Sequence, residues 1–392
     1  MTIALYPNHP QAARLEQHLF VGRTAFNRAL EARIHWYKTS GKSPSFYDQC
    51  DDLTALRAAD SFWSDTPVSV ERDALRRLDK AFVAFFRRLK NGTGRPGFPR
   101  FKGRSRWHSF TIAECGSVVK HGRIRVSGVD GLIRCRNLQP IEGAIIEQRI
   151  VRRATKWYCQ LVINDEREAP PPRPIRQAVG IDVGLSTFAT VSDGETIENP
   201  RFGKKLERKL AHAHRQVSRT KKGSKNRRKR VASLQRVYVQ IQNQRHNFTH
   251  HASKAIIAKY DLVAVEDLNI DGMVRGRLAK SILDACWGQF IFQLCYKAEK
   301  AGCTFLKVNP SGTSQECSGC GMVVPKDLSV RIHDCPHCGL VLCRDANAAR
   351  NILARALRSS KHSAPVGRTV MPAEGRVAAP VKQEGTHQQV LV

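Results

Sequence analysis

Apolar side chains recur at helical spacing in two long segments of the N-terminal third. From Pro10 to Tyr37 they fall three or four residues apart, as on one face of an α-helix. The second segment, Val70 to Leu89, places these residues on one face: Leu75, Leu78, Phe82, Phe86 and Leu89. We expect a helical hairpin with a packed inner face. The outer face of the second helix carries Arg76 and Arg77, which we expect to contact a phosphate backbone.

Between Ser109 and Ile163 the pattern changes to short, partly alternating runs separated by turns. SFTI, GRIRV, GLIRCR, IIEQRIVRR and KWYCQLVIN are typical of short β-strands. We expect a small β-barrel or curled sheet with basic side chains facing outward, an architecture that often binds nucleic acid. An ordinary solvated sheet fits this segment equally well. The acidic and then proline-rich DEREAPPPRPIRQ predicts an extended linker after the sheet.

The second half of the chain alternates predicted strands and helices. AVGIDVGLSTFATVSDGETIENP predicts two strands joined by a turn at Asp193-Gly194. DLVAVEDL and TFLKVNP predict two further strands, and SILDACWGQFIFQLCYKAEKAG between them predicts one helix ended by Gly302. This order is typical of an α/β domain. The polar tail after about Ser359 has no period, and we expect it to be disordered.

The charge balance indicates a polyanionic partner. The 392 residues carry a formal net charge of +31, which is most often associated with nucleic-acid binding. Between Arg201 and Arg230, fourteen Lys or Arg residues stand against one acid. Such a run is often only a solvated face, but here it leads into a helical pattern, so we expect a basic helical hairpin along a nucleic-acid duplex. The expected contacts are Lys221, Lys222, Lys225, Arg227 and Arg228.

A membrane partner is not expected, because no apolar run approaches the roughly 20 residues that span a bilayer and no signal peptide opens the chain. The chain has twelve cysteines, of which four form two CxxC pairs and the others are scattered. A disulfide framework is typical of small secreted chains, so we read the scattered cysteines as small apolar core residues. The expected location is the bacterial cytosol or nucleoid.

The two CxxC pairs predict a structural zinc site. Cys317 and Cys320 are separated from Cys335 and Cys338 by fourteen residues. Four thiolates satisfy the tetrahedral preference of Zn²⁺ and leave no position open for catalysis. His333 and His337 are alternative ligands that lie within the same stretch, although the thiolates are favoured.

Three acids in separate segments suggest a second metal site. Asp182 lies in the strand GIDVG, Glu266 ends the strand DLVAVED, and Asp345 lies in CRDANAA. A carboxylate in an apolar strand is costly unless it is paired or bound to metal. Each acid taken alone is explained more simply by a capping or ion-pair role than by metal binding, and for Asp345 that role is the N-cap of the following helix. Together, in so basic a chain, they match the oxygen ligands that Mg²⁺ requires beside phosphate.

The sequence resembles the TnpB family, the transposon-encoded RNA-guided DNA endonucleases related to small type V CRISPR effectors and often labelled transposases. The matching segments include LYPNHPQ, GFPRFKG, GIDVGLSTFATVSDG, VAVEDLNIDGM, TSQECSGCG, CPHCG and RDANAARNIL, in the family's order. The resemblance implies an α/β RNase H-like (RuvC) nuclease domain at 175–310 and 340–358. It implies an inserted zinc ribbon at 311–339 and a tail at 359–392.

The resemblance also implies an N-terminal wedge β-barrel at 1–9 and 95–170 that carries a helical recognition lobe at 10–94. The catalytic acids would be Asp182, Glu266 and Asp345, binding Mg²⁺. The implied partners are a guide RNA from the transposon end, target double-stranded DNA beside a short adjacent motif, and a separately encoded transposase.

One residue departs from the family pattern. The family has Asp-Arg-Asp at the third acid, whereas this chain has Cys343-Arg344-Asp345. The second acid, which precedes ANAA, is retained. Two alternatives to a nuclease therefore stay open: an RNA-guided DNA-binding protein or repressor with weak nuclease activity, and a transposase accessory protein.

Overall fold

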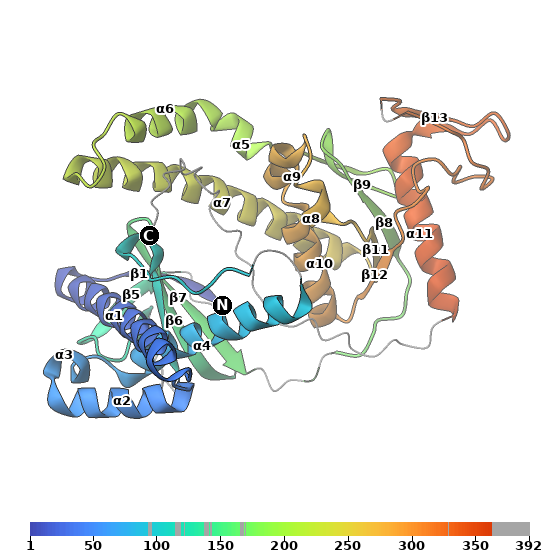
Figure 1. Ribbon diagram of the computed structural model, residues 1–392. Coiled ribbons are helices and arrows are strands. Elements are labelled where there is room, and N and C mark those ends of the chain that lie inside the picture. Colours follow the sequence, from blue (N-terminus) through green and yellow to red (C-terminus); the bar gives the residue numbers. More distant parts are fainter. Residues whose placement is uncertain are drawn as a thin grey trace. The chain divides into compact units, whose positions relative to one another are not determined.

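The computed structural model describes residues 1–92, 96–113, 119–120, 122–136, 141, 143–164, 168, 170–327 and 329–362. The chain divides into two compact units (Figure 1). The first comprises 1–171, 200–252 and 278–290, and the second comprises 172–199, 253–277 and the residues from 291 onward. The predicted disordered tail lies outside the described residues, except that 359–362 continue the C-terminal helix.

A seven-stranded antiparallel sheet forms the N-terminal part of the first unit, in the order β2-β6-β7-β1-β5-β4-β3. Its strands are β1 (Thr2–Tyr6), β2 (Ser109–Ala113), β3 (Val119–Lys120), β4 (Arg123–Arg125), β5 (Leu132–Arg136), β6 (Ala144–Arg153) and β7 (Lys156–Asn164). The first strand of the chain thus pairs with β5 and β7, more than a hundred residues later. Closure of this sheet into a wedge barrel stays a prediction, because β2 and β3 end the sheet order among the described residues.

Four helices accompany this sheet. They are α1 (His9–Ser40), α2 (Phe46–Ala59), α3 (Ser61–Ser64) and α4 (Val68–Asn91). Helices α1 and α4 pack against β2, and α2 packs on α3 and α4. The helices and the sheet share one hydrophobic core, in which Ile3 of β1, Leu15 of α1 and Leu78 of α4 are fully buried. Asn8 and Gln11 form a capping box at the start of α1, and Gly41 ends the helix at a φ of 68°.

The sequence pattern missed α2 and overestimated the buried face of α4. Helix α2 buries only Gln49 and Leu53, too few residues to give a helical period. In α4 the predicted inner face is buried as far as Phe82, but Phe86 and Leu89 are 59% and 50% exposed. The spacing of the apolar residues predicted the helix correctly. How much of its apolar face is buried depends on where the neighbouring elements end.

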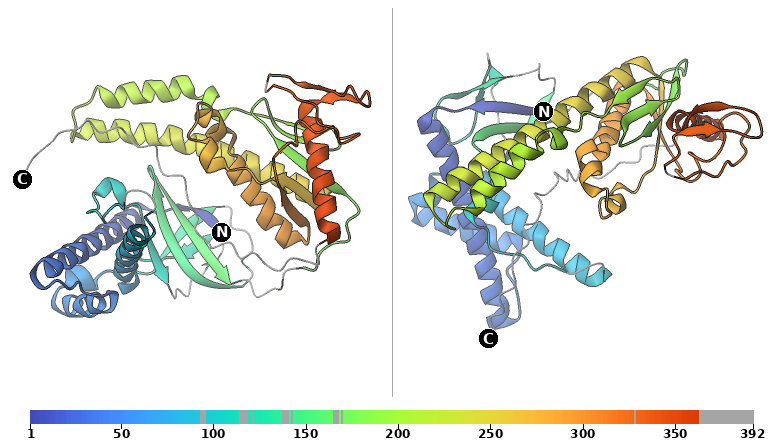
Figure 2. Two further views of the ribbon diagram at one scale, coloured as in Figure 1. Left: turned by 45° about the vertical axis from the view of Figure 1, so that its right-hand side comes forward. Right: turned by 90° about the horizontal axis from the view of Figure 1, so that it is seen from above.

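The basic segment folds as two antiparallel helices, which lie side by side in Figures 1 and 2. After the short helix α5 (Phe202–Lys205), α6 (Glu207–Ser218) leads into α7 (Lys225–Lys259). Val217 of α6 is buried, as are Leu234 and Ile241 of α7. The predicted helical hairpin is therefore present.

The second unit contains a five-stranded sheet in the order β10-β9-β8-β11-β12. Its strands are β8 (Ala178–Val183), β9 (Thr187–Val191), β10 (Thr196–Glu198), β11 (Leu262–Glu266) and β12 (Thr304–Val308). Strand β11 runs parallel to both β8 and β12, and all five of its residues are buried. The segment predicted as two strands forms three, because a second reversal follows β8 before the Asp193-Gly194 turn.

The unit also contains α8 (Ile270–Met273), the ribbon strands β13 (Ile332–Asp334) and β14 (Val341–Cys343), and α11 (Arg344–His362). The segment predicted as one helix is two, α9 (Ala279–Ala285) and α10 (Trp287–Ala301), because Cys286 between them adopts a left-handed backbone with a φ of 59°. Cys135, Cys159 and Cys303 are buried as predicted, but Cys295 and Cys343 are exposed. Cys115 lies outside the described residues.

Helix α11 packs directly on β8 at Gly180. A Cβ atom at this position would lie 2.1 Å from the carbonyl oxygen of Ala349 and 2.6 Å from the backbone nitrogen of Leu353. Ala348 and Ala349 of α11 are fully buried, so small residues on both elements permit this close approach. The contact fixes the first turn of α11 close to the end of β8.

Substitution of Gly180 by Ala should displace α11, because both clashing atoms belong to the backbone and cannot rotate away. We expect a loss of about 1–3 kcal/mol in the free energy of unfolding, measured by chemical denaturation. Gly276→Ala is the control, since a Cβ there meets only the Met273 carbonyl oxygen at 3.5 Å. Equal stability of the two variants would contradict this packing argument.

Candidate active site and zinc ribbon

Asp182 and Glu266 occupy equivalent positions on neighbouring strands. Strands β8 and β11 are parallel, and Ile181 pairs with Val265. The next residue on each strand is the acid, so both carboxylates lie at the carboxyl edge of the sheet. Glu266 is 9% exposed, and Asp182 is partly buried. The position of an acid at the end of an apolar strand follows directly from the sequence.

The electrostatics of Asp182 connect all three predicted acids. Burial raises the pKa of Asp182 well above its ordinary value, and the carboxylates of Glu266 and Asp345 raise it further, whereas Arg344 lowers it. Carboxylates affect one another in this way only at short range. Glu266 and Asp345, which follow Asp182 by 84 and 163 residues in sequence, therefore lie near enough to influence its carboxyl group. Carboxylate oxygens are the ligands that a divalent cation prefers, but among the described residues the four cysteines are the only group of three or more possible ligands with all ligand atoms within 4.8 Å of one another.

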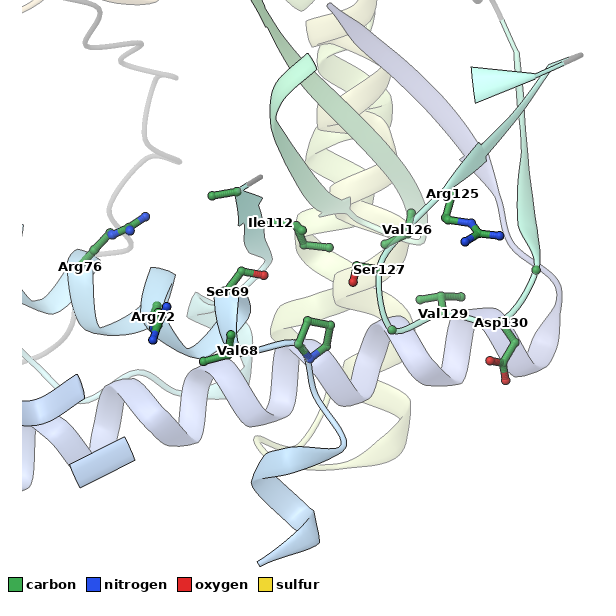
Figure 3. A pocket seen from close by; sticks show the side chains of 14 residues that line it. Val68, Ser69, Arg72, Arg76, Ile112, Arg125, Val126, Ser127, Val129 and Asp130 are labelled. Atoms are coloured by element: carbon green, nitrogen blue, oxygen red, sulfur yellow. The ribbon is translucent and has the colours of Figure 1, made fainter. Parts of the chain in front are cut away.

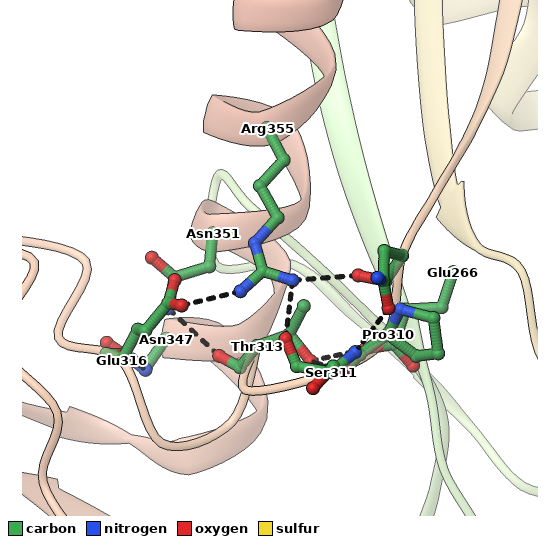
Figure 4. Close-up of polar contacts among 9 residues, drawn as sticks. Glu266, Pro310, Ser311, Thr313, Glu316, Asn347, Asn351 and Arg355 are labelled. Carbon is green, nitrogen blue, oxygen red and sulfur yellow. Dashed lines mark hydrogen bonds and ion pairs between the residues drawn. The ribbon is translucent and has the colours of Figure 1, made fainter.

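Glu266 is held by a loop that the last helix positions (Figure 4). The hydroxyl of Thr313 donates to Glu266 Oε1 at 2.5 Å. Burial raises the pKa of Glu266, and the Thr313 hydrogen bond and Arg355 oppose that shift. Asn351 of α11 donates to the carbonyl oxygens of Thr313 and Glu316 at 2.9 and 2.7 Å. A hydrogen-bonded path thus connects α11 to the carboxylate of Glu266.

Asn347 and Arg355 lie one turn before and after Asn351 and bind the same loop. Asn347 donates to the Glu316 carbonyl oxygen and accepts from the Ser318 backbone nitrogen. Arg355 donates to the carbonyl oxygens of Asn309 and Ser311 and pairs with Glu316 at 2.8 Å. The sequence reasoning missed these residues. Their signal is a polar residue at every fourth position, 347, 351 and 355, which places all three side chains on one face of the helix.

Asp345 is the second residue of α11, within its first turn rather than at the N-cap position. Its Oδ1 lies 3.3 Å from Nε and Nη2 of Arg344, and its Oδ2 lies 3.8 Å from Nη1 of Arg331. Arg331 also donates to the Ser186 hydroxyl at 3.0 Å. These guanidinium groups place positive charge beside the acids. Sequence reasoning gave neither arginine a role, because a lone arginine does not stand out in so basic a chain.

The four predicted cysteines converge on one point. The sulfur atoms of Cys317, Cys320, Cys335 and Cys338 all lie within 4.8 Å of one another. Cys317 and Cys338, and likewise Cys320 and Cys335, are 3.6 Å apart. Tetrahedral zinc with bonds of about 2.3 Å places its sulfur ligands ~3.8 Å apart, so the geometry fits the ion. Neither histidine belongs to the cluster.

His333 instead lies beside the cluster. Its side chain is fully buried, and Lys326 contacts its Nδ1 atom. Burial raises the pKa of the Cys317 thiol, but hydrogen bonds from the Cys320 backbone and from His333 outweigh burial and lower that pKa to about 5. A deprotonated thiolate is the form that binds zinc. The Arg344 backbone nitrogen donates to the Arg331 carbonyl oxygen, which links the ribbon to the first turn of α11.

Some of the residues predicted to contact nucleic acid are exposed, and others bind groups within the protein. Lys221, Lys222, Lys225 and Arg228 are exposed at the turn between α6 and α7. Arg227 donates to the Val217 and Thr220 carbonyl oxygens and so closes this turn. Arg77 pairs with Asp73 at 2.7 Å and lies over the Trp107 ring. These two arginines have structural contacts that their sequence positions do not reveal.

Arg76 instead lines a cavity of about 730 Å³ in the first unit (Figure 3). The cavity lies between the start of α4 and the loop that follows β4. Arg72 and Arg125 also line it, together with the hydroxyl-bearing Ser69 and Ser127. Asp130 lines the cavity as well, and three guanidinium groups and two hydroxyls against this one carboxylate suit an anionic group such as a phosphate.

Known proteins resemble about nine tenths of this chain. A "Putative RNA-guided DNA endonuclease" of Streptomyces pristinaespiralis is 32% identical over 366 residues, which cover 91% of this chain and 88% of that protein. The chain belongs to the TnpB family. The "Putative RNA-guided DNA endonuclease InsQ" of Escherichia coli (strain K12) is another relative, 30% identical over 370 residues, which cover 89% of this chain and 90% of InsQ.

Family models match three segments of this TnpB-family chain. The family described as "Probable transposase" matches residues 160–277, and that described as "Cas12f1-like, TNB domain" matches 287–352. A "Helix-turn-helix domain" matches residues 1–42, which in this structure hold β1 and the single helix α1. The fold resembles that in a "Cryo-EM structure of the Cas12f1-sgRNA-target DNA complex", with a TM-score of 0.53, 14% identity, and coverage of 88% of this chain and 83% of that one. Among the described residues, no helix is both long and apolar enough to cross a membrane.

Replacement of Cys335 by Ser should remove one sulfur ligand from a site that has no spare. We expect zinc content to fall from about one ion per chain to about zero, together with a lower folding yield and thermal midpoint, because metal binding and folding are coupled in such ribbons. Elemental analysis of the purified protein measures the first effect. Cys295→Ser is the control, because Cys295 is exposed and lies outside the cluster. A stable Cys335→Ser protein without zinc would contradict a structural role.

Asp182→Asn should stabilise the metal-free protein at neutral pH. The folded-state pKa of Asp182 is raised, so the unfolded chain loses this proton at lower pH than the folded chain does. Stability therefore falls as pH rises from about 4 through the raised pKa, and the penalty persists at pH 7.5. Removing the charge should raise the thermal midpoint at pH 7.5 in chelator but not at pH 4. A lower midpoint in Asp182→Asn at pH 7.5 would contradict the proposed repulsion.

Proposed function

We propose that this chain is a transposon-associated RNA-guided DNA endonuclease that hydrolyses phosphodiester bonds with Mg²⁺ bound by Asp182, Glu266 and Asp345. The observation that carries the proposal is the equivalent placement of Asp182 and Glu266 on paired parallel strands, with Asp345 near enough to contribute to the raised pKa of Asp182. Relatives named RNA-guided DNA endonucleases match about nine tenths of the chain. The sheet order and the ribbon inserted before α11 support an RNase H-like (RuvC) domain as the catalytic unit.

Each residue of the site has a separate task in this proposal. Bound Mg²⁺ would activate water for attack on the scissile phosphate and stabilise the leaving oxygen. Thr313 orients Glu266 through its hydroxyl, and α11 holds Asp345 opposite the ends of β8 and β11. Arg331 and Arg344 offer guanidinium groups next to the acids, where a phosphate of the substrate would otherwise meet only negative charge.

Nucleic-acid binding requires surfaces away from the acids. The exposed Lys221, Lys222, Lys225 and Arg228 would contact phosphates without sequence preference. The arginine-lined cavity beside α4 offers a second contact, in the part of the chain where the TnpB resemblance implies recognition of target DNA. Guide pairing would supply the sequence specificity. The zinc ribbon would be structural, because all four of its ligands belong to the chain.

The retained third acid favours a nuclease over an RNA-guided binding protein without cleavage activity. Cys343, which stands where the family has its first Asp, lies exposed at the end of β14. Burial and Glu266 raise the pKa of Asp182 most, and Asp345 also contributes, so a third carboxylate acts on Asp182 without an acid at position 343. A separately encoded transposase remains a proposed partner.

Alanine at Asp182, Glu266 or Asp345 should abolish Mg²⁺-dependent cleavage and leave target binding nearly unchanged, because affinity comes from guide pairing and the basic surface. The test uses protein purified from cells that carry the native flanking DNA, sequencing of the copurified RNA, and a plasmid library matched to that RNA. Cleavage and filter binding are then measured on the same preparations.

Asp345→Asn separates a metal ligand from a residue that only stabilises the start of α11. Asn keeps the size and hydrogen-bonding capacity of Asp but is a poor replacement for an anionic ligand. We expect Asp345→Asn to fold normally and to lose cleavage, as Asp345→Ala does. If Asp345→Asn cuts DNA like the parent, the third ligand lies elsewhere. If no RNA copurifies and no matched plasmid is cut, the guided-nuclease proposal itself is wrong.

A further inference from the structure

The C-terminal part of α4 presents an apolar face that no described element covers. The same face is buried further back, where Leu78 is fully buried and Phe82 is 9% exposed. Beyond Phe82, the side chains of Val83, Phe86 and Leu89 are 59%, 59% and 50% exposed. Large apolar side chains that cluster at the surface typically mark a binding site. Helix α4 is labelled in Figure 1.

The exposed rings form part of an ordered aromatic cluster. Phe85 contacts Phe86 and Phe98 with ring centroids 5.2 and 5.4 Å apart, in edge-to-face geometry. Phe98, which is 47% exposed, also contacts Phe82 at 5.5 Å, and Phe82 belongs to the core of the first unit. Contacts with the core therefore hold Phe86 and Phe98 in place while leaving much of each ring accessible.

The surroundings of these rings are uniformly basic. From Lys80 to Ala113 the sequence contains nine Lys or Arg residues and no Asp or Glu. Four of the nine are exposed next to the rings in sequence and form no ion pair with any described residue: Arg87, Arg88, Lys90 and Arg100. We name Phe86, Leu89 and Phe98, with these four residues, the aromatic-basic patch. Its charge requires an anionic occupant.

Charge complementarity distinguishes between possible occupants. A second copy of this chain would bring another strongly positive surface, since the net charge is +31, and like charges across an interface are costly. Unpaired nucleotides combine flat apolar bases with phosphates, and they match exposed rings flanked by arginines. A duplex offers phosphates but no base faces, so it would leave the rings uncovered.

We propose that the aromatic-basic patch binds unpaired nucleotides of the guide RNA, with bases stacked on Phe86 and Phe98 and phosphates bound by the flanking arginines. The assignment to RNA rests on the proposed function. Under that proposed function the guide would be bound before target DNA is met, so the guide is the nucleic acid available to cover the patch between targets. An exposed apolar patch needs lasting cover to avoid aggregation, and the guide supplies it.

The test compares aromatic and aliphatic replacements. Phe86→Leu combined with Phe98→Leu retains an apolar surface but removes stacking, whereas Phe86→Tyr combined with Phe98→Tyr retains the rings. We expect the Leu pair to weaken binding of a fluorescent oligouridylate about tenfold, and the Tyr pair to bind like the parent. Val83→Leu is the control for a change at an exposed apolar position without a ring. Equal binding by the Leu and Tyr pairs would overturn the proposal.

A second measurement identifies the occupant directly. Full-length protein with p-benzoylphenylalanine in place of Phe86 is purified with its copurifying RNA and irradiated. We expect a crosslinked species that ribonuclease removes and deoxyribonuclease does not. A crosslinked protein dimer, a crosslink only to added target DNA or to anionic phospholipid vesicles, or no crosslink would overturn the proposal.

The outcome is independent of the cleavage test. Suppose that Asp182→Ala loses cleavage while the Leu pair binds RNA like the parent. This result would overturn the proposal that the patch binds RNA and would leave the nuclease proposal unaffected. Conversely, failure to find any guided cleavage would not affect the oligouridylate comparison, which measures stacking on the patch alone.

Discussion

Burial of Asp182 close to two other carboxylates is the constraint on which the candidate site depends. Asp182, Glu266 and Asp345 come from two strands and a helix, and without a cation their proximity is unfavourable. The contact that imposes this proximity is the backbone-to-backbone packing of α11 on β8 at Gly180. Because Asp345 lies one turn before Ala349, this packing fixes the distance of the helix from the strand and the position of the third acid together.

The loop and zinc ribbon before α11 connect the position of this helix to that of Glu266. The chain leaves the sheet after β12, forms the zinc ribbon, and returns through β14 directly into α11. Asn347, Asn351 and Arg355 bind the loop that precedes the ribbon, and Thr313 of that loop binds Glu266. A long insertion without internal crosslinks would loosen such an arrangement through its conformational entropy. Zinc bound by the four cysteines would remove much of that freedom.

Sequence reasoning reached the residues with distinctive chemistry and missed those whose role depends on neighbours. The acids and cysteines stand out because a carboxylate ending an apolar strand and a CxxC pair are rare without a reason. Arg331 and Arg344 could not be found this way, because arginine is common throughout the chain. Helix α2 was missed for lack of an apolar period, and the break at Cys286 has no Gly or Pro to mark it. The burial of Phe86 was overestimated because periodicity gives the direction of a side chain but not what covers it.

Net charge alone does not assign function to a basic residue. Arg77 and Arg227 were expected to contact nucleic acid, yet each has several partners within the chain. A basic residue that is exposed, as Lys221 and Arg76 are, can direct its charge toward a phosphate of a bound nucleic acid. The acids show the opposite relation. Arg331 and Arg344 compensate the charge of the acids only in part, because the pKa of Asp182 stays raised, and a bound cation would offset the remaining repulsion. The acids that we expect to destabilise the metal-free protein are therefore the same acids that a metal-dependent activity requires. The packing of the surrounding strands and helix must offset this cost in stability.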